Sequence, residues 1–119
     1  MYISESDKAI IRQLIEKQLQ AFQQDDPQTA FSLTSPTIQR KFNCTDFMAM
    51  ISNNYHAILK PRSIMFRGFT LVNDFPALVA MIMDQDGSLI QGIFVVQHQR
   101  DYSWRIHGYE LVPVDEKIF

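Results

Sequence analysis

The hydrophobic pattern of the chain changes period once, at Pro61, and this change constrains the fold more than any other feature. Before Pro61, apolar residues recur every three or four positions, which is typical of helices buried on one side. After it, short apolar runs are bounded by Asp, Asn, Gly and Pro, which indicates strands. A block of helices followed by a block of strands predicts an α+β domain.

The first and longest helix is expected to begin near Ser4 or Ser6, since either hydroxyl can cap it. Its buried stripe is Ile10, Ile11, Leu14, Ile15, Leu19 and Phe22. Two short helices open at Asp26-Pro27 and Ser35-Pro36, because a capping side chain followed by proline suits a first helical turn. A longer helix capped by Thr45 completes the helical half. Its stripe is Phe47, Met50, Ile51, Tyr55 and Ile58.

Four strands are expected after Pro61, in one antiparallel meander. They span Ser63–Val72, Ala77–Asp84, Ser88–Gln99 and Ser103–Val112. Asp86-Gly87 is a strong hairpin signal, because both residues tolerate the positive φ of a tight turn. The connections are too short for parallel crossovers, which makes the sheet antiparallel.

Two-residue turns centred on Asp86-Gly87 and Asp101-Tyr102 give a provisional register, with Met83 opposite Ile90 and His98 opposite Arg105. One face of the sheet then carries Leu78, Ala80, Ile82, Gln91 and Trp104, in line with Arg67. A one-residue bulge near Gly92 or Gly108 would exchange the two faces beyond it.

The second and third strands are apolar on both faces, although one face of an antiparallel sheet usually meets water. The helices can cover only one of these faces. We therefore expect a homodimer that packs sheet against sheet, since monomers rarely expose large apolar patches. A strongly coiled sheet that shields its own second face is the alternative.

Composition excludes several classes of function. The net charge is −2 and the eleven Lys and Arg residues are scattered, which argues against a nucleic-acid partner. The single Cys44 permits no internal disulfide and no thiolate zinc site. The longest apolar run, Ala77–Met83, is too short to span a bilayer, and the first residues lack the pattern of a signal peptide. We therefore expect a cytoplasmic protein without a membrane partner.

Three segments together resemble a known family. They are Gln18–Phe31 with its aspartate pair, the stretch from Ser35-Pro36 to Pro61, and Gln97 with Trp104–Tyr109. The resemblance covers about Ile11 to Leu111 and is to an uncharacterised bacterial domain of unknown function, whose assumed fold is the cystatin-like cone of the nuclear transport factor 2-like superfamily.

The resemblance implies a single domain over residues 1–119, with N-terminal helices packed on a curved four-stranded antiparallel meander. It also implies a dimer and a pocket between helices and sheet. It implies no reaction, because the superfamily holds isomerases, dehydratases, cyclases and many non-catalytic modules.

The candidates for lining such a pocket are Tyr55, Arg67, Gln91, Trp104 and His107. Arg67 and Gln91 would orient an anionic ligand if their face meets the helices; otherwise Arg67 is a surface arginine. Trp104 is expected in the core, with Gln97 or Gln99 accepting its indole N–H. His107 is expected to be a packing or interface residue.

No catalytic residue, metal ligand or cofactor is predicted. The interiors of the first three strands lack Asp and Glu, and the three histidines are too scattered for a metal site. Asp25 and Asp26 are interpreted as a solvated residue and a helix cap. Cys44 is interpreted as an ordinary free thiol in a loop near a helix N-terminus.

The leading hypothesis is a non-catalytic dimeric module that binds a small apolar or weakly anionic ligand between helices and sheet. One alternative is an acid–base enzyme of the isomerase, cyclase or dehydratase type, using His107, Tyr55 or Tyr109. The other is a protein-interaction module that uses the open face of the sheet.

Overall fold

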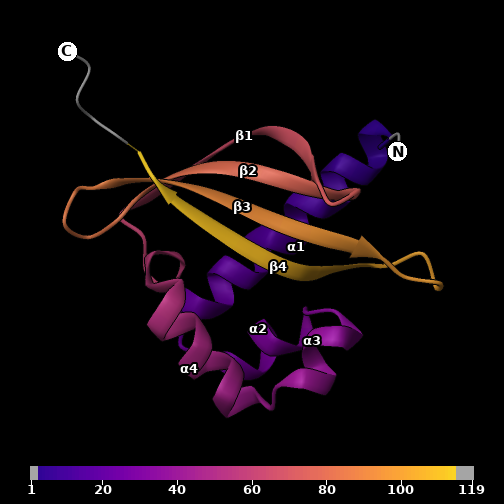
Figure 1. The fold of residues 1–119 in the computed structure, drawn as a ribbon, viewed down its shortest axis with the longest axis horizontal. Helices are drawn as coiled ribbons and strands as arrows, with labels where there is room; N and C mark the ends of the chain where they lie inside the picture. Colours follow the sequence, from indigo (N-terminus) through magenta and orange to yellow (C-terminus); the bar gives the residue numbers. More distant parts are fainter. Residues whose placement is uncertain (1–2, 115–119) are drawn as a thin grey trace.

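The helices and the sheet form two layers, in a computed structural model that describes residues 3–114 (Figure 1). The helical elements are α1 (Glu5–Gln23), α2 (Pro27–Ser32), α3 (Pro36–Lys41), α4 (Cys44–Asn54) and the 3₁₀ turn η1 (His56–Ile58). The strands are β1 (Ser63–Val72), β2 (Phe75–Met83), β3 (Leu89–His98) and β4 (Trp104–Pro113). All neighbouring strands pair antiparallel in the order β1-β2-β3-β4, so the expected α+β class and meander are confirmed.

Three of the expected helix caps are confirmed. The Ser4 hydroxyl accepts the Asp7 N–H at 3.0 Å, and the Asp26 carboxylate accepts the Thr29 N–H at 3.2 Å. Ser35 caps α3 in the same way. Each cap satisfies an amide that has no partner inside its helix.

The expected cap of α4 is wrong. Asn43 rather than Thr45 accepts the Asp46 N–H, at 2.7 Å, and α4 therefore begins at Cys44. Asn at this position competes well with Thr, because its short side chain reaches the amide three residues on. Cys44 consequently lies in the first turn of the helix and not in the preceding loop.

The two later hairpins have loops of three residues, and the predicted two-residue turns are wrong. In the first, the Gly87 N–H bonds to the Asp84 carbonyl and Gly87 has a φ of 85°. Tyr102 plays the same part in the second loop, with a φ of 69°. A type I turn followed by a left-handed residue makes such a loop.

An odd loop length shifts the register by one residue. Met83 therefore pairs with Leu89 rather than with Ile90. His98 likewise pairs with Trp104 rather than with Arg105. A bulge then moves the β3–β4 register between Val95 and Val96. Of the two bulge positions considered, the one near Gly108 occurs, and beyond it Phe94 lies opposite Tyr109 as predicted.

The first hairpin is tighter than expected. Asn73 and Asp74 turn the chain with φ values of 49° and 70°, and β2 starts at Phe75 rather than at Ala77. Pro76 is tolerated inside β2 because pairing with β3 begins only at Ala77, so no ladder hydrogen bond is lost there.

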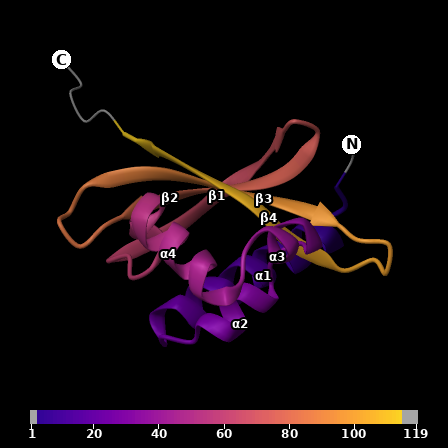
Figure 2. The same ribbon diagram turned by 60° about the horizontal axis from the view of Figure 1, so that its bottom comes forward.

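The main core lies between the helices and one face of the sheet, here called the inner face (Figure 2). The sheet contributes Leu78, Ala80, Ile82, Phe94, Val96, Trp104 and Ile106, and the helices contribute Ile11, Ile15, Leu19, Phe22, Phe47 and Ile51. Ile10, expected in the stripe of α1, is 50% exposed. Gln18 instead lies fully buried on the apolar side of that helix.

The opposite, outer face of the sheet has no helix of residues 3–114 over it (Figure 2). Its apolar side chains are Met65, Val72, Phe75, Ala77, Val79, Met81, Met83, Leu89, Ile93, Val95 and Val112, of which Ala77 and Val95 are buried. The middle strands are therefore apolar on both faces, as the sequence predicts. Met65, on the edge strand β1, is 60% exposed, whereas the apolar side chains of the middle strands on this face are half buried or buried within the described chain.

The segment that joins α2 to α3 covers part of the β4 edge. Thr34 forms a parallel bridge with Ile106, in which the Ser35 N–H donates to the Ile106 carbonyl at 2.7 Å. The Ile106 N–H donates in turn to the Leu33 carbonyl at 2.9 Å. This bridge fixes α3 beside the sheet. None of the helices in residues 3–114 is long and apolar enough to cross a membrane.

Candidate functional site

A cleft of about 450 Å³ opens between α3, the C-terminal end of α4 and the edge strand β4. Its lining consists of Thr37, Ile38, Lys41, Phe42, Met50, Tyr55, His107, Gly108 and Tyr109. We call it the α3–β4 cleft. It exists because the Thr34–Ile106 bridge holds the start of α3 beside the edge of β4.

Tyr55 and Tyr109 form the aromatic end of the cleft. Tyr55 ends α4, and its ring lies 5.4 Å from the ring of Tyr109. The Tyr109 hydroxyl donates to the side-chain carbonyl of Gln18 at 2.7 Å. Burial raises the pKa of Tyr109 far above its usual range, so this hydroxyl stays neutral and serves the fold.

His107 owes its position to the bulge in β4. Its Nδ1 lies 2.8 Å from the Ser35 hydroxyl, and its ring packs 4.9 Å from the ring of Phe75. Partial burial lowers the pKa of His107 below its usual value of 6.5, which favours the neutral imidazole. Because Nδ1 faces Ser35, a neutral imidazole has only Nε2 left, which is a donor or an acceptor depending on the tautomer.

The Ser35–His107 pair has the composition of a nucleophile and a base, but its geometry is that of a helix cap. Ser35 is fully buried, and its hydroxyl already accepts the Ile38 N–H. A substrate carbonyl has no access to this oxygen. The pair therefore ties α3 to β4, and the arrangement does not favour nucleophilic catalysis.

Lys41 gives the cleft its charge. It lies in the last turn of α3, and within the described chain its ammonium forms no ion pair. No Asp or Glu of residues 3–114 lines the cleft. The cleft therefore combines apolar walls with one cation, a tyrosine hydroxyl and an imidazole, a set that suits an anion with an apolar body.

The structure brings Tyr55 and His107 together but keeps the other sequence candidates apart from them. Gln91 pairs with Met81 and faces outward, because the odd hairpin loop reversed its predicted face. Arg67 is the extra residue of a bulge in the edge strand β1 and is exposed. Neither lines the α3–β4 cleft, and Arg67 is a surface arginine.

Trp104 lies in the core, as expected, but its predicted hydrogen bond is wrong. The indole is 6% exposed and stacks on His98 at a ring distance of 4.3 Å. Its Nε1 has no acceptor in the described chain. Gln97 alternates to the outer face, and Gln99, whose amide donates to Gln97, does not accept the indole N–H.

Sequence reasoning missed Lys41 and the use of Gln18. In the sequence, Lys41 is one of two adjacent cations, and cations are favoured at the C-terminal end of any helix, so nothing marks it as a site residue. Gln18 carries a visible signal, because it follows Ile15 by three positions and Ile11 by seven, on the buried side of α1. Its partner, however, lies 91 residues away.

The aspartate pair can be placed as well. Asp26 caps α2 as expected, while Asp25 has a φ of 54° and forms an ion pair with Lys60 at 3.2 Å. Within residues 3–114, no group of three or more His, Cys, Asp or Glu side chains is arranged to hold a metal ion.

Comparison with known families identifies the family of this chain. Residues 4–119 match the family model described as Domain of unknown function (DUF4864), and the chain belongs to this family. The resemblance to an uncharacterised domain family is thereby confirmed. Comparisons with curated proteins and with solved structures give no significant match.

Proposed function

We propose that this DUF4864 domain is a non-catalytic binding module, which holds a small apolar or weakly anionic molecule in the α3–β4 cleft and pairs with a second copy through its outer sheet face. The observation that carries the ligand proposal is the composition of the cleft. Lys41, Tyr55 and His107 surround an apolar floor, and no carboxylate of the described chain lines it.

The charge balance supports an anion rather than a cation as the preferred ligand head group. Lys41 attracts a carboxylate, and the Tyr55 hydroxyl can donate a hydrogen bond to it. Ile38, Phe42 and Met50 supply apolar contacts for the remainder of the ligand. Methionine adapts to varied apolar shapes, which suits a ligand of modest specificity.

The polar groups at the cleft already form hydrogen bonds within the fold, which supports a binding role over catalysis. Proton abstraction requires a base within hydrogen-bond reach of the substrate and a second group that stabilises the developing charge. The only side-chain hydrogen-bond partner of His107 in the described chain is Ser35, which is buried, and the Tyr109 hydroxyl donates to Gln18.

The outer face supports pairing of two copies. Val79, Met81, Met83 and Ile93 lie on adjacent strands and form a continuous apolar surface. A two-fold axis through this surface would bury the same side chains from both copies. We propose this face as the homodimer contact, in a protein of the bacterial cytoplasm.

We further propose that the fold is related to the cystatin-like cone of the nuclear transport factor 2-like superfamily. The supporting features are the long helix α1 lying under a twisted antiparallel meander and the short helices closing one end (Figure 1). A solved structure of a relative with this cone and the same strand order would strengthen the relation.

A thermal-shift screen tests the ligand proposal. The panel contains hydrophobic carboxylates, steroids and the corresponding neutral alcohols. A ligand present at 100 times its Kd stabilises the folded state by about 2.7 kcal/mol, which raises the midpoint of thermal unfolding by several degrees. We expect shifts with carboxylates that exceed those of the alcohols. No shift across the panel would refute the proposal.

A further inference from the structure

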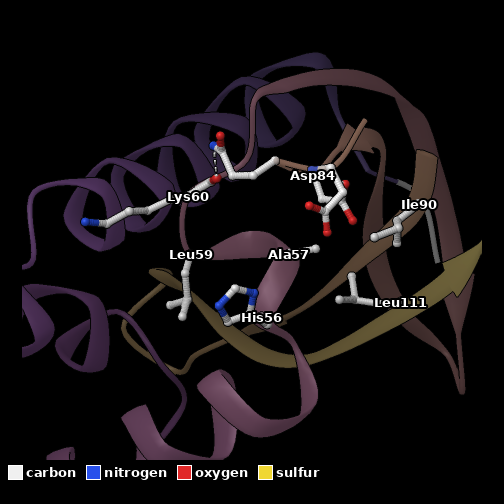
Figure 3. Close-up of a pocket in the computed structure, with 9 residues that line it drawn as sticks. His56, Ala57, Leu59, Lys60, Asp84, Ile90 and Leu111 are labelled. Atoms are coloured by element: carbon white, nitrogen blue, oxygen red, sulfur yellow. Dashed lines mark hydrogen bonds between the residues drawn. The ribbon is translucent and has the colours of Figure 1, made fainter. Parts of the chain in front are cut away.

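A second cavity of about 560 Å³ lies apart from the α3–β4 cleft, between η1 and the turn that joins β2 to β3 (Figure 3). We call it the η1–turn cavity. Its lining consists of His56, Ala57, Leu59, Lys60, Asp84, Gln85, Asp86, Ile90 and Leu111. None of these residues lines the α3–β4 cleft, so the two sites can be tested independently.

The cavity exists because the sheet extends beyond the helical layer. Ile90 and Leu111 point to the helix side of the sheet yet remain only half buried. Ile58 of η1 is fully buried under the sheet, whereas the neighbouring Ala57 is too small to fill the remaining space. The result is an apolar floor that an incoming hydrocarbon group can cover.

Hydrogen bonds within the turn and to the segment after η1 constrain the charged rim of the cavity. One oxygen of Asp84 accepts the N–H groups of Asp86 and Ser88, both at 2.9 Å. The Gln85 amide donates to the Lys60 carbonyl at 2.6 Å and so joins the turn to the segment after η1. These bonds constrain the turn at the mouth of the cavity before a ligand binds, which lowers the ordering cost of binding.

Two cations lie near the rim, and neither forms an ion pair with the rim carboxylates in the described residues. The Lys60 ammonium reaches Asp25 at 3.2 Å, and its side chain extends away from Asp84 in Figure 3. Arg62 donates to the Gln85 carbonyl from its side of the turn at 3.2 Å. Asp84 and Asp86 form no ion pair within the described residues, so the rim offers two carboxylates above an apolar floor.

We propose that the η1–turn cavity binds a small organic amine, with its hydrocarbon or aromatic body on Ala57, Ile90 and Leu111 and its ammonium at the carboxylates of Asp84 and Asp86. The imidazole of His56 stands at the same rim as a further polar contact. A carboxylate ligand is disfavoured here by the same charges that attract an ammonium. The charge preference is thus opposite to that of the α3–β4 cleft.

Titration followed by amide NMR tests the proposal. The probes are 2-phenylethylamine, its neutral analogue 2-phenylethanol and the anion 3-phenylpropanoate. We expect the amine to shift the amides of Ala57, of the loop 84–88 and of Ile90, with a Kd at least fivefold below that of the alcohol. Equal affinity for amine and alcohol, or amine shifts confined to other residues, would overturn the proposal.

Matched variants separate charge from shape. Asparagine at both rim positions (Asp84→Asn with Asp86→Asn) keeps an oxygen that can accept the turn amides but removes both charges, and it should raise the Kd of the amine at least fivefold. Ala57→Leu fills the floor and should weaken the amine and the alcohol alike. The control is Asp101→Asn, a charge removal in the other hairpin loop, where Asp101 also accepts the N–H two residues on.

An unchanged amine Kd in the asparagine variant would show that the carboxylates do not recognise the ammonium and would refute the proposal. The proposal also fails if Asp101→Asn weakens the amine equally, because the effect would then be one of net charge. Binding of 3-phenylpropanoate with shifts at Lys41 and His107 reports only on the α3–β4 cleft. Failure of one site therefore leaves the result for the other intact.

Discussion

The hydroxyl of Tyr109 on β4 donates a hydrogen bond of 2.7 Å to the side chain of Gln18 on α1. The amide of Gln18 donates in turn to the Ala30 carbonyl of α2 at 2.9 Å. One buried glutamine therefore joins three elements. Its replacement leaves a buried hydroxyl without an acceptor, and this cost exceeds the net worth of the hydrogen bond itself.

We expect Gln18→Met, which keeps the shape of the side chain, to lower the free energy of unfolding by about 2 kcal/mol in urea titrations. Adding Tyr109→Phe to this variant should recover part of the loss, because the stranded hydroxyl is removed. A double variant whose loss equals the sum of the two single losses would show that the two side chains are not coupled.

His107 should make stability depend on pH. Its pKa is lowered in the folded state by burial, so the unfolded chain binds a proton more readily. The contribution is complete above the unfolded value of 6.5 and declines as the pH falls towards the lower folded pKa. Urea titrations between pH 5 and 8 measure this decline, and His107→Gln should reduce it. An identical pH dependence in the variant would contradict the assignment.

The outer sheet face should control association. Analytical ultracentrifugation of the wild type at tens of micromolar is expected to give a dimer of the 13.9 kDa chain. Met81→Lys places a charge at the centre of the contact in both copies and should give a monomer with unchanged circular dichroism. Ile10→Lys is the control, since Ile10 is an exposed apolar residue on the helical side. A monomeric wild type would refute the dimer.

The contribution of Lys41 to ligand affinity in the α3–β4 cleft can be measured by comparing it with the adjacent Arg40. Lys41 lines the cleft and Arg40 does not, although both lie in the last turn of α3. Lys41→Gln should raise the Kd of a hydrophobic carboxylate about threefold to fivefold, the effect of roughly 1 kcal/mol. Calorimetry on Arg40→Gln should give a smaller change. Equal effects would indicate long-range attraction rather than contact.

Gly92 is required by close packing on the inner face. A Cβ at this position would lie 2.7 Å from Cδ1 of Ile82 and 3.4 Å from the Phe94 ring. Because Ile82 is fully buried, we expect Gly92→Ala to cost about 1–3 kcal/mol, measured by chemical unfolding. Ile82→Val should relieve the strain in the double variant. Gly68→Ala is the control, since a Cβ there meets no atom within 4 Å.

Much of the fold was predictable because its signals are local. Pro61 separates the two periods, and Asp26-Pro27 and Ser35-Pro36 announce their helices within two residues. The strand faces were not predictable, because they depend on whether a loop holds two residues or three. Asp86-Gly87 is compatible with both, and the longer loop reversed the predicted face of Gln91.

The site was predictable only in part. Tyr55 and His107 could be singled out by residue type, but their meeting depends on the Thr34–Ile106 bridge, a contact between distant segments. The hydrogen bonds of Gln18 could not be predicted from the sequence for the same reason. A buried polar side chain can be suspected from helical position, whereas its partner is fixed only by tertiary packing.

The Thr34–Ile106 bridge also bears on how large an assembly of this protein can grow. The unpaired backbone groups of an open edge strand can pair with a strand of another chain. Repeated pairing of this kind produces fibres. Here one edge of the sheet is partly occupied by the chain's own backbone, and the other, β1, is interrupted by the bulge at Arg67. If two copies pair through their outer sheet faces, each face is buried by the other. No outer face is then left for a third copy, so this mode of association stops at a dimer.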